Sequence, residues 1–588
     1  MPKGYVVLVL HAHLPYVLSH GKWPHGSDWL CEAACETYIP LLNTLDRLSK
    51  EGKSAHFTIG ITPILCEMLA APLFKSELKA YIAEKVRAAT HDRRSFTSDG
   101  RQGQADLARG WRVFYESRLK DFTDAYQEDL LGAFRRLEQE GQIEIIVSAA
   151  THAYLPLLGR DASISAQIAI GVETYRKHFL TDPVGMWLPE CAYSPGKGPL
   201  DEEGRTGSPR KRLETFLAAH NLKYFFLDGC QLLQRQEPLG YGMEIARKLS
   251  LWESGVPSRQ YDEGFGPRVE SIPPPPEDRE RRVWSEGQTP LYAIHKTGSP
   301  ESGECAFFVR DTDTSLQVWS GQRGYPGDPA YLEFHKKHAP GGLRYWRVTD
   351  HEGDLGTKLP YEPDKAQARV LAHAAHFKKV IEERLDRYMR ETGRTGVLTL
   401  PFDAELFGHW WFEGIDWLYA LASAFSENCV KIERASAVLQ SIGPVGAVSL
   451  PEGSWGEGGL HLTWDNKETA WTWECIHGAE RSMAEAVAGE VDEAGARILR
   501  QMARELLLLQ SSDWQFLITT GTAADYGKSR FLGHYKAFEA LQHMYEGYKR
   551  TRVLEDSERD ALRVLEERDA VFDNVNLEWF KERMGDGL

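Results

Sequence analysis

The feature that most constrains the fold is a series of short, continuous apolar runs separated by helix-like segments. Seven such runs occur, at residues 6–10, 56–62, 143–150, 184–189, 223–228, 345–350 and 396–401. Apolar runs of this length without polar alternation are typical of strands covered on both faces, as in parallel sheets. Helix-like stretches such as residues 36–52 and 364–393 lie between several of them. The pattern predicts seven strands with helical crossovers, either a βα barrel or an open doubly wound sheet.

Titratable side chains follow four of these runs directly. They are His11 and His13 after the first run, His152 after the third, Glu190 after the fourth and Asp403 after the last. In βα barrels the active site is assembled just beyond the carboxyl ends of different strands. We therefore expect these groups to share one pocket.

The chain divides into two regions and an insertion. Between about residues 234 and 304, Gly, Pro and clustered charges replace the strand and helix pattern, and SIPPPPEDRERR (271–282) suits neither a helix nor a central strand. From residue 417 onward the pattern is mostly helical, with apolar residues at helical spacing at Ile498, Met502, Leu506 and Leu509, and at Tyr535, Phe538, Leu541, Tyr545 and Tyr548. We predict a catalytic barrel over 1–416 with a loop-rich insertion at 234–304, and a C-terminal helical domain over 417–588.

The charge balance restricts the partners of this chain. Lys plus Arg is 69 and Asp plus Glu is 85, so the formal charge is −16, which argues against nucleic acid or an anionic membrane. No stretch approaches the ~20 apolar residues of a membrane-spanning helix, and the first apolar run is too short for a signal peptide. The eight cysteines contain no CxxC pair, so the sequence suggests neither a disulfide framework nor a thiolate zinc site. We expect a soluble, cytoplasmic protein with a neutral or cationic small partner.

Two acidic residues among aromatic side chains are candidates for catalysis. The chain has 17 Trp, and flat aromatic faces commonly hold the apolar faces of sugar rings. Glu190 lies in WLPECAY and Asp403 in PFDAELFGHWWFEG, each just after a buried strand. Lost hydration raises a carboxyl pKa there, and two carboxyls in unequal environments can serve as nucleophile and proton donor. For either residue alone, a helix cap or an ion-pair partner is the alternative.

The residues around His11 leave three interpretations open. His11 and His13 stand two apart in an extended segment, so their side chains share one face. They could bind a metal with His152, Glu190 or Asp403, hydrogen-bond a polar substrate, or be satisfied by backbone groups. The EGSWGEGG segment (452–459) lacks the GK[ST] of a phosphate loop, and its Trp455 fits a stacking platform better.

Several motifs occur together in a consistent order along the chain. They are HAHLPY (11–16), ATHAYLP (150–156), MWLPECAY (186–193), PFDAELFGHWWFEG (401–414), EGSWGEGG (452–459), WTWECIHGAERSM (471–483) and SSDWQFLITTGTAADY (511–526). In these motifs the sequence resembles glycoside hydrolase family 57, in the branch of α-1,4-glucan branching enzymes and close α-amylase-like relatives. The match covers most of the chain. The resemblance implies a (β/α)7 barrel, an incomplete TIM-like barrel, with a helical C-terminal domain that closes one side of the cleft.

The resemblance also implies residue roles. Glu190 would be the nucleophile and Asp403 the general acid and then base. His11, His13 and His152 would hydrogen-bond sugar hydroxyls, with no metal or other cofactor. Further substrate contacts are expected from Arg310, Trp319, Gly327, Trp455, Trp464 and Asp513. The residues that could be either stacking platforms or core are Trp187 and Trp410, and those expected beside Asp403 are Glu405 and His409.

The implied activity is cleavage of an α-1,4 bond with retention and transfer of the chain to a 6-hydroxyl, by a monomer acting on glycogen or amylose-like chains. An α-amylase or 4-α-glucanotransferase would use the same catalytic atoms and is the first rival activity. Branching members carry a gating tyrosine on a mobile loop, for which Tyr241, Tyr261 and Tyr292 are candidates. Two more distant functions also fit the residues, namely a metal-dependent hydrolase or deacetylase built on His11 and His13, and a non-catalytic glucan-binding protein.

Overall fold

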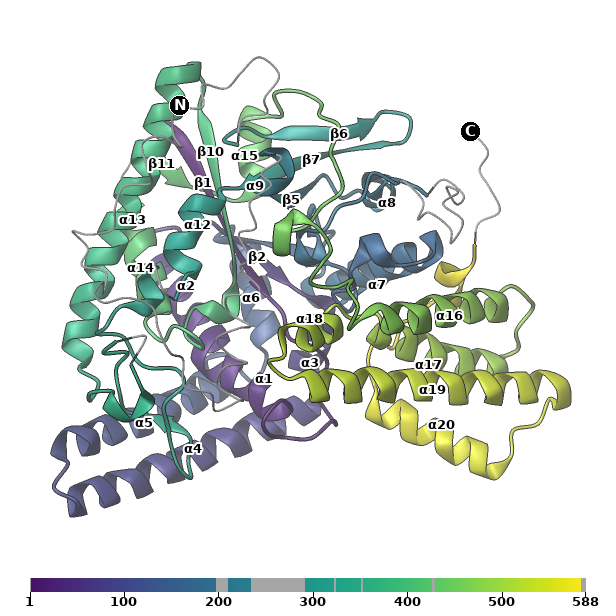
Figure 1. The fold of residues 1–588 in the computed structure, drawn as a ribbon, viewed down its shortest axis with the longest axis horizontal. Coiled ribbons are helices and arrows are strands. Elements are labelled where there is room, and N and C mark those ends of the chain that lie inside the picture. Colours follow the sequence, from purple (N-terminus) through teal and green to yellow (C-terminus); the bar gives the residue numbers. More distant parts are fainter. Residues whose placement is uncertain are drawn as a thin grey trace.

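A closed barrel of seven parallel strands forms the centre of the protein (Figure 1). The computed structural model describes residues 2–196, 210–233, 291–321, 324–350, 353–425 and 429–582. The strands follow the order β10-β1-β2-β3-β4-β5-β7, and a pairing between β10 and β7 closes the ring. Their bounds are β1 (Gly4–Ala12), β2 (Phe57–Ile61), β3 (Ile143–Ser148), β4 (Gly185–Trp187), β5 (Tyr224–Asp228), β7 (Gly303–Arg310) and β10 (Gly396–Asp403). The predicted (β/α)7 barrel is confirmed, and the open doubly wound sheet is not formed.

The prediction is wrong for one of the seven strands. Residues 345–350 form no strand of the barrel; Leu343–Arg344 (β9), just before them, pairs with Lys337–His338 (β8) in a separate two-stranded sheet. The barrel strand missing from the prediction is β7, which starts inside the segment interpreted as an insertion and pairs antiparallel with β6 (His295–Ser299). Only five residues of β7 are continuously apolar, between Glu304 and Arg310, so its sequence signal is weak. The rest of that segment, residues 234–290, lies outside the described residues.

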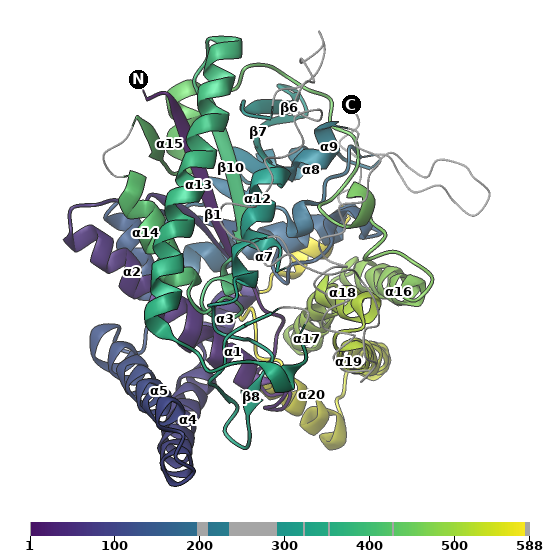
Figure 2. The same cartoon turned by 60° about the vertical axis from the view of Figure 1, so that its left-hand side comes forward.

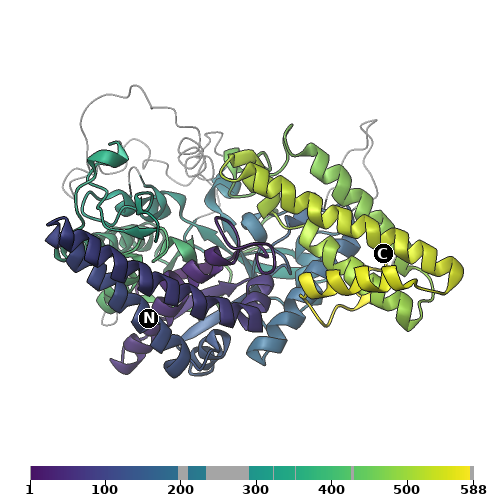
Figure 3. The same ribbon diagram turned by 90° about the horizontal axis from the view of Figure 1, so that it is seen from below.

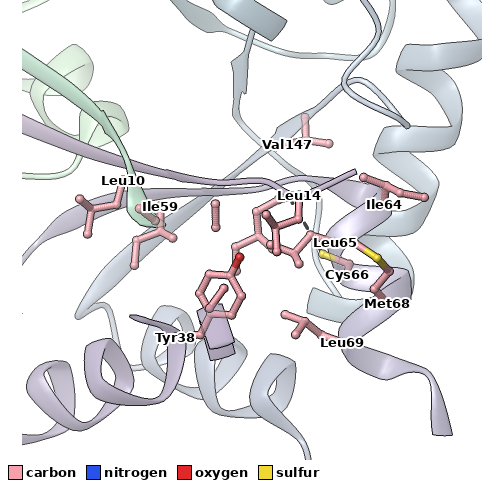
Figure 4. Close-up of a cluster of buried hydrophobic side chains, with 14 of the residues drawn as sticks. Leu10, Leu14, Tyr38, Ile59, Ile64, Leu65, Cys66, Met68, Leu69 and Val147 are labelled. Carbon is pink, nitrogen blue, oxygen red and sulfur yellow. Dashed lines mark hydrogen bonds between the residues drawn. The ribbon is translucent and has the colours of Figure 1, made fainter. Parts of the chain in front are cut away.

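Alternate residues of β1 face two separate apolar cores. Val7 and Val9 belong to a cluster inside the barrel, whereas Leu8 and Leu10 belong to the larger core that packs against the helices. Figure 4 shows part of this outer core, in which Leu10 lies beside Ile59 of the neighbouring strand and the side chains of α3 (Pro63–Ala70) continue the same cluster. Both faces of the strands are therefore dry, which explains the absence of polar alternation in their sequences. Burial of each such Leu or Val contributes roughly 1.5–3 kcal/mol to stability.

Helices surround the barrel and lie between its strands in the chain. Those that follow or precede barrel strands are α1 (Ser27–Ala33), α2 (Ile39–Lys50), α3, α6 (Leu130–Gln139), α7 (Asp161–Phe179), α8 (Leu213–Ala219), α9 (Gly229–Leu233), α12 (Thr312–Trp319), α13 (Pro363–Thr392), α14 (Gly414–Phe425) and α15 (Ala435–Ile442). A long helical hairpin of α4 (Pro72–Ser98) and α5 (Gln102–Lys120) extends away from the barrel (Figure 2). A short strand, β11 (Val430–Ile432), pairs with β1, so the sheet includes residues beyond 416.

The C-terminal region is helical and lies beside the barrel (Figure 3). It consists of α16 (Ala470–Val487), α17 (Glu493–Leu509), α18 (Asp513–Thr520), α19 (Ala524–Thr551) and α20 (Asp556–Arg568). The predicted apolar stripe of α17 is fully buried. The turn between α17 and α18 docks on the loop after β3, where Ala153 and Ser511 form an antiparallel bridge. Within the described parts of the chain, no helix combines the length and the apolar character needed to cross a membrane.

Candidate active site

The register of β1 sets the position of the first histidine. Side chains two apart in a strand lie on the same face, so His11 faces the barrel interior together with Val7 and Val9. It pairs with Asp403 of β10 on one side and with Gly60 of β2 on the other. A Cβ atom at Gly60 would come within 2.8 Å of His11 Nδ1, so only glycine leaves room for the imidazole there.

Glu190 lies on a strained turn immediately after β4. Its φ is 60° and that of Cys191 is 50°, both in the left-handed region that non-glycine residues rarely adopt. Strain of this kind is typical of functional turns and is maintained by surrounding contacts. The Glu190 Oε2 atom accepts a hydrogen bond of 2.7 Å from Trp455 Nε1, and Oε1 accepts one of 3.0 Å from the Ser512 hydroxyl. The turn and its two donors fix the carboxyl group at the barrel mouth.

Asp403 ends β10, on the other side of the ring. Along the strand order, β10 is four positions from β4 in one direction and three in the other, so the two strands that carry these carboxyls lie on opposite sides of the ring. Burial and the charge of Asp403 together raise the pKa of Glu190 to about 7, against the effect of the Trp455 hydrogen bond. Burial and the charge of Glu405 raise the pKa of Asp403 to about 7. At neutral pH the pair therefore holds about one proton.

His13 is held by polar groups from three other parts of the chain. Its Nδ1 atom is 3.0 Å from Thr62 Oγ1, its Nε2 atom is 3.0 Å from Asp513 Oδ2, and its backbone N–H donates to Glu405 Oε1 at 3.1 Å. Burial lowers the pKa of His13, but the carboxylates of Asp513, Glu405 and Glu190 outweigh burial and the net shift is upward. Among the three imidazoles of the site, His13 is therefore the one whose pKa is raised, so its protonated form is favoured by the neighbouring carboxylates.

The other two imidazoles are neutral and hydrogen-bonded. Burial lowers the pKa of His11 and of His152 well below the usual value, and the His13 charge adds to both shifts. His11 Nε2 lies 3.1 Å from His152 Nε2, and the His11 ring stacks on Trp187 at 4.6 Å. Among the described residues, side chains spaced as metal ligands occur elsewhere, at His20, His534 and Asp569 and at Glu32, Glu36 and His409. The geometry favours hydrogen bonding over metal ligation for His11 and His13.

An arginine and a tryptophan complete the wall beside Glu190. Trp455 lies on the predicted 452–459 loop, and its backbone N–H donates to the Glu190 carbonyl at 3.1 Å. The guanidinium carbon of Arg310, at the end of β7, is 5.4 Å from the centroid of the Trp455 ring. Arg310 Nε is 3.3 Å from Asp228 Oδ2 at the end of β5, and both side chains are almost fully buried. Arg310 therefore presents a fixed positive charge at the barrel mouth.

The remaining tryptophans named from the sequence are mostly buried. Trp187 is fully buried beneath His11, and Trp464 packs on Tyr154 at 4.5 Å with 1% of its surface exposed. Trp319 is also buried, whereas Trp410 is half-buried. Trp187 therefore supports the site as a core residue, and substrate contacts by Trp319, Trp410 and Trp464 stay predictions.

Three further predicted positions lie around this centre. Gly327 is buried in the turn Tyr325–Gly327. His409 Nδ1 is 3.8 Å from Glu36 Oε2, so it contacts the π-helical segment Ala34–Tyr38. The hydroxyl of the gate candidate Tyr292 donates to Asp311 at 2.8 Å and its ring packs on Tyr388, within the wall between β7 and α13. This position does not favour Tyr292 as a gate, and Tyr241 and Tyr261 lie outside the described residues.

The sequence analysis missed four polar residues of the site. Thr62 and Asp228 are the last residues of two of the apolar runs, so the rule that selected Glu190 would also have found them. Ser512 stands beside Asp513 in the SSDW motif but has no distinguishing spacing of its own. Tyr38, whose hydroxyl donates to Glu405, comes from a helix start and carries no recognisable signal.

The fold and the site together define a class of enzyme. A parallel barrel presents two partly buried carboxyls, each with a pKa raised to about 7, beside a tryptophan, an arginine and three imidazoles. One carboxylate that attacks and one carboxylic acid that protonates a leaving oxygen are the groups that a retaining glycoside hydrolase needs.

Comparison with known proteins identifies the family. The model of "Glycosyl hydrolase family 57" matches residues 7–451, and that of "1,4-alpha-glucan branching enzyme, C-terminal" matches residues 475–580. The 1,4-alpha-glucan branching enzyme TK1436 of Thermococcus kodakarensis is 39% identical over 574 residues, which cover 97% of this chain and 77% of that protein. The chain belongs to glycosyl hydrolase family 57.

Solved structures of the family resemble this chain over nearly its whole length. The crystal structure of TK1436 with glucose has a TM-score of 0.86 at 37% identity, covering 99% of this chain and 97% of that one. A GH57-type branching enzyme from Pyrococcus horikoshii gives 0.83 at 37% identity, with the same coverage. The α-amylase AmyC from Thermotoga maritima gives 0.77 at 29% identity, covering 99% of this chain and all of that one.

Proposed function

We propose that this chain is a 1,4-α-glucan branching enzyme, which cleaves an α-1,4 bond with retention and joins the released chain to a 6-hydroxyl as an α-1,6 branch. The observation that carries the proposal is the pair of Glu190 and Asp403, which follow strands on opposite sides of the barrel and each have a pKa raised to about 7. The relatives called branching enzymes, which match this chain from the barrel to the C-terminal helices, support the choice of reaction.

In the first step, Glu190 attacks the anomeric carbon of the donor glucan. Asp403 gives its proton to the leaving glycosidic oxygen, and a covalent glycosyl-enzyme ester forms on Glu190. The hydrogen bonds from Trp455 and Ser512 hold the attacking carboxylate in one orientation, which reduces the entropic cost of reaching the transition state. The charges of His13 and Arg310 both lower the pKa of Asp403 and so keep it near neutrality despite burial.

In the second step, Asp403 acts as a base. It takes the proton of an acceptor 6-hydroxyl, whose oxygen attacks the glycosyl carbon and releases Glu190 with an α-1,6 linkage formed. If water takes the place of the acceptor, the same atoms hydrolyse the chain. Exclusion of water and alignment of an acceptor glucan therefore decide between branching and hydrolysis.

The proposal also covers the substrate, the oligomeric state and the cellular location of the enzyme. We infer glycogen or amylose-like chains as substrates, without a metal or other cofactor, and a monomeric enzyme. A cytoplasmic location is supported by the eight cysteines, all of which are free thiols in the structure. The division into a barrel over 1–416 and a helical domain over 417–588 remains part of this proposal.

Product analysis on amylose tests the function. Chains released from the product by an α-1,6-specific debranching enzyme support branching, whereas new reducing ends without branches support hydrolysis. The similarity to AmyC makes the hydrolytic outcome the second candidate. A wild-type protein that binds glycogen but forms neither product would overturn both and leave a binding protein.

The activity should depend on pH as a narrow bell centred near pH 7. Below about pH 7 Glu190 gains a proton and loses its nucleophilic charge, and above about pH 7 Asp403 loses the proton that the leaving oxygen needs. Because the charge of Asp403 raises the pKa of Glu190, the two carboxyls titrate as a coupled pair, and both limbs of the profile belong to that pair. The measurement is kcat/KM on amylose from about pH 5 to about pH 9. A profile that stays flat between these limits would contradict the paired titration.

Asp513→Asn should lower kcat/KM by roughly 10- to 150-fold, because a hydrogen bond to a charged group contributes about 1.5–3 kcal/mol. The Asp513 carboxylate is the main cause that raises the pKa of His13, so the variant should lower that pKa and disfavour the protonated ring. Asp525→Asn removes the same charge from an exposed residue of α19 and should leave kcat/KM unchanged. Equal kcat/KM values in the two variants would show that the Asp513 charge has no role.

A further inference from the structure

Ser512 reaches the barrel nucleophile from the C-terminal helical region. It stands in the turn between α17 and α18, and its backbone N–H donates to the His152 carbonyl at 3.3 Å. The adjacent Ala153–Ser511 bridge and a hydrogen bond from the Thr151 hydroxyl to the Leu507 carbonyl fasten the same turn to the loop after β3. The position of the Ser512 hydroxyl is therefore fixed by backbone contacts on both sides.

Three consecutive hydrogen bonds connect the nucleophile to the floor of the site. The Ser512 hydroxyl is 3.0 Å from Glu190 Oε1 and 3.0 Å from His152 Nδ1, and His152 Nε2 is 3.1 Å from His11 Nε2. His11, His152 and Ser512 are all buried. The series ends at His11, whose Nδ1 atom faces Gly60 and has no hydrogen-bond partner among the described residues.

Counting hydrogens gives this series a direction. A carboxylate only accepts, so the single O–H of Ser512 must point at Glu190. The Ser512 oxygen can then only accept from His152, which places the proton of that neutral ring on Nδ1. His152 Nε2 is then a bare acceptor, and the proton of the neutral His11 ring lies on Nε2. If the Ser512 hydroxyl donated to His152 instead, the lone pairs of its oxygen would face the negative charge of Glu190, which is unfavourable.

We propose that Ser512 is a positioning residue for Glu190, held in its donating orientation by His152 and His11. The inference deepens the proposed function, because it takes Glu190 as the nucleophile. The Ser512 hydroxyl favours the ionised carboxylate and restricts its rotation, so the C-terminal helical region contributes directly to the competence of the barrel site. Besides Ser512, the described side chains that act on the charge of Glu190 include Trp455, Asp403, Asp513 and His13, and His152 Nδ1 lies 3.7 Å from Glu190 Oε1.

Ser512→Ala, with Ser512→Thr as its partner variant, tests this role on the full-length protein. The alanine variant should lower kcat on amylose roughly 10- to 150-fold, the effect of losing one hydrogen bond to a charge, with KM changed by less than about 2-fold. Its acidic limb should move up by about one pH unit, because the lost donor no longer favours ionised Glu190. Ser512→Thr keeps the hydroxyl, so its kcat and the position of its acidic limb should be those of the wild type. Ser76→Ala, on the exposed face of α4, is the matched control for serine removal.

A second measurement is independent of turnover. Carbodiimide modifies protonated carboxyls, so labelling of the Glu190 peptide against pH, followed by mass spectrometry, reports the Glu190 midpoint. We expect this midpoint to rise in Ser512→Ala and to return in Ser512→Thr. An unchanged midpoint together with wild-type kcat in Ser512→Ala would overturn the inference. If the wild type forms neither branches nor reducing ends, the proposed function fails, while the labelling midpoints still decide the role of Ser512.

Discussion

Glu190→Gln should lower turnover on amylose by at least ~10⁴-fold, in line with losses measured when a nucleophile is removed from an enzyme. The amide cannot form the glycosyl ester, yet it has nearly the shape of the carboxyl group. Its oxygen can accept from Trp455 Nε1, and its NH₂ can donate to the Ser512 oxygen, so both existing contacts can be kept. Binding of maltooligosaccharides should therefore persist within a few-fold.

The measurement for Glu190→Gln pairs initial rates of branch formation with glucan affinity and thermal unfolding. Glu490→Gln, which changes an exposed residue between α16 and α17, should behave as wild type in all three. Near-normal turnover in Glu190→Gln would show that another group attacks the substrate. A loss of turnover that came with a lowered melting temperature and lost binding would instead indicate a folding defect.

The barrel could be predicted from the sequence because its strands are buried on both faces. Residues such as Val6–Leu10 are continuously apolar for that reason, and six of the seven runs form barrel strands. An apolar run fails to predict a strand where a buried segment is not a strand, or where a barrel strand has charged residues at its ends. Tyr345 is fully buried in residues that pack without joining the barrel, whereas β7 is a barrel strand flanked by charged Glu304 and Arg310.

The site could be predicted in part by a topological rule. The carboxyl ends of parallel strands meet at one mouth, so His11, Glu190 and Asp403 could be grouped without knowing any distance. This rule cannot predict which segments from distant parts of the chain pack against the barrel mouth. Ser512 reaches Glu190 only because the α17–α18 turn bridges the loop after β3, and no local pattern records that contact.

The environments of the two carboxyls explain why they should have different roles. Glu190 accepts hydrogen bonds from Trp455 and Ser512, which favour its ionised form and oppose the effect of burial. Asp403 lies beside Glu405, whose charge opposes ionisation of Asp403. Both pKa values are nevertheless raised to about 7, and the proposed first step uses the form of the pair with the proton on Asp403 and the attacking charge on Glu190.

Asp403→Asn should lower turnover on amylose by ~10²–10⁴-fold, the usual contribution of general acid and base catalysis. Protonation of the leaving oxygen limits the first step only when the leaving group is a poor one. A maltosyl fluoride donor needs no such proton, so the variant should form its glycosyl ester from this donor at a rate close to wild type. The second step still lacks its base, and the ester on Glu190 should accumulate and be seen as a mass increase of the intact protein.

The comparison of the two donors separates a proton-transfer role from a positioning role. If Asp403 only oriented the substrate, Asp403→Asn would be impaired equally with amylose and with the fluoride, and no ester would accumulate. The charge change has a further consequence, because Asp403 raises the pKa of Glu190. Its removal should therefore move the acidic limb of the remaining activity to lower pH, opposite to the shift expected for Ser512→Ala. Asp386→Asn on the outer face of α13 is a matched control with no expected effect on either donor.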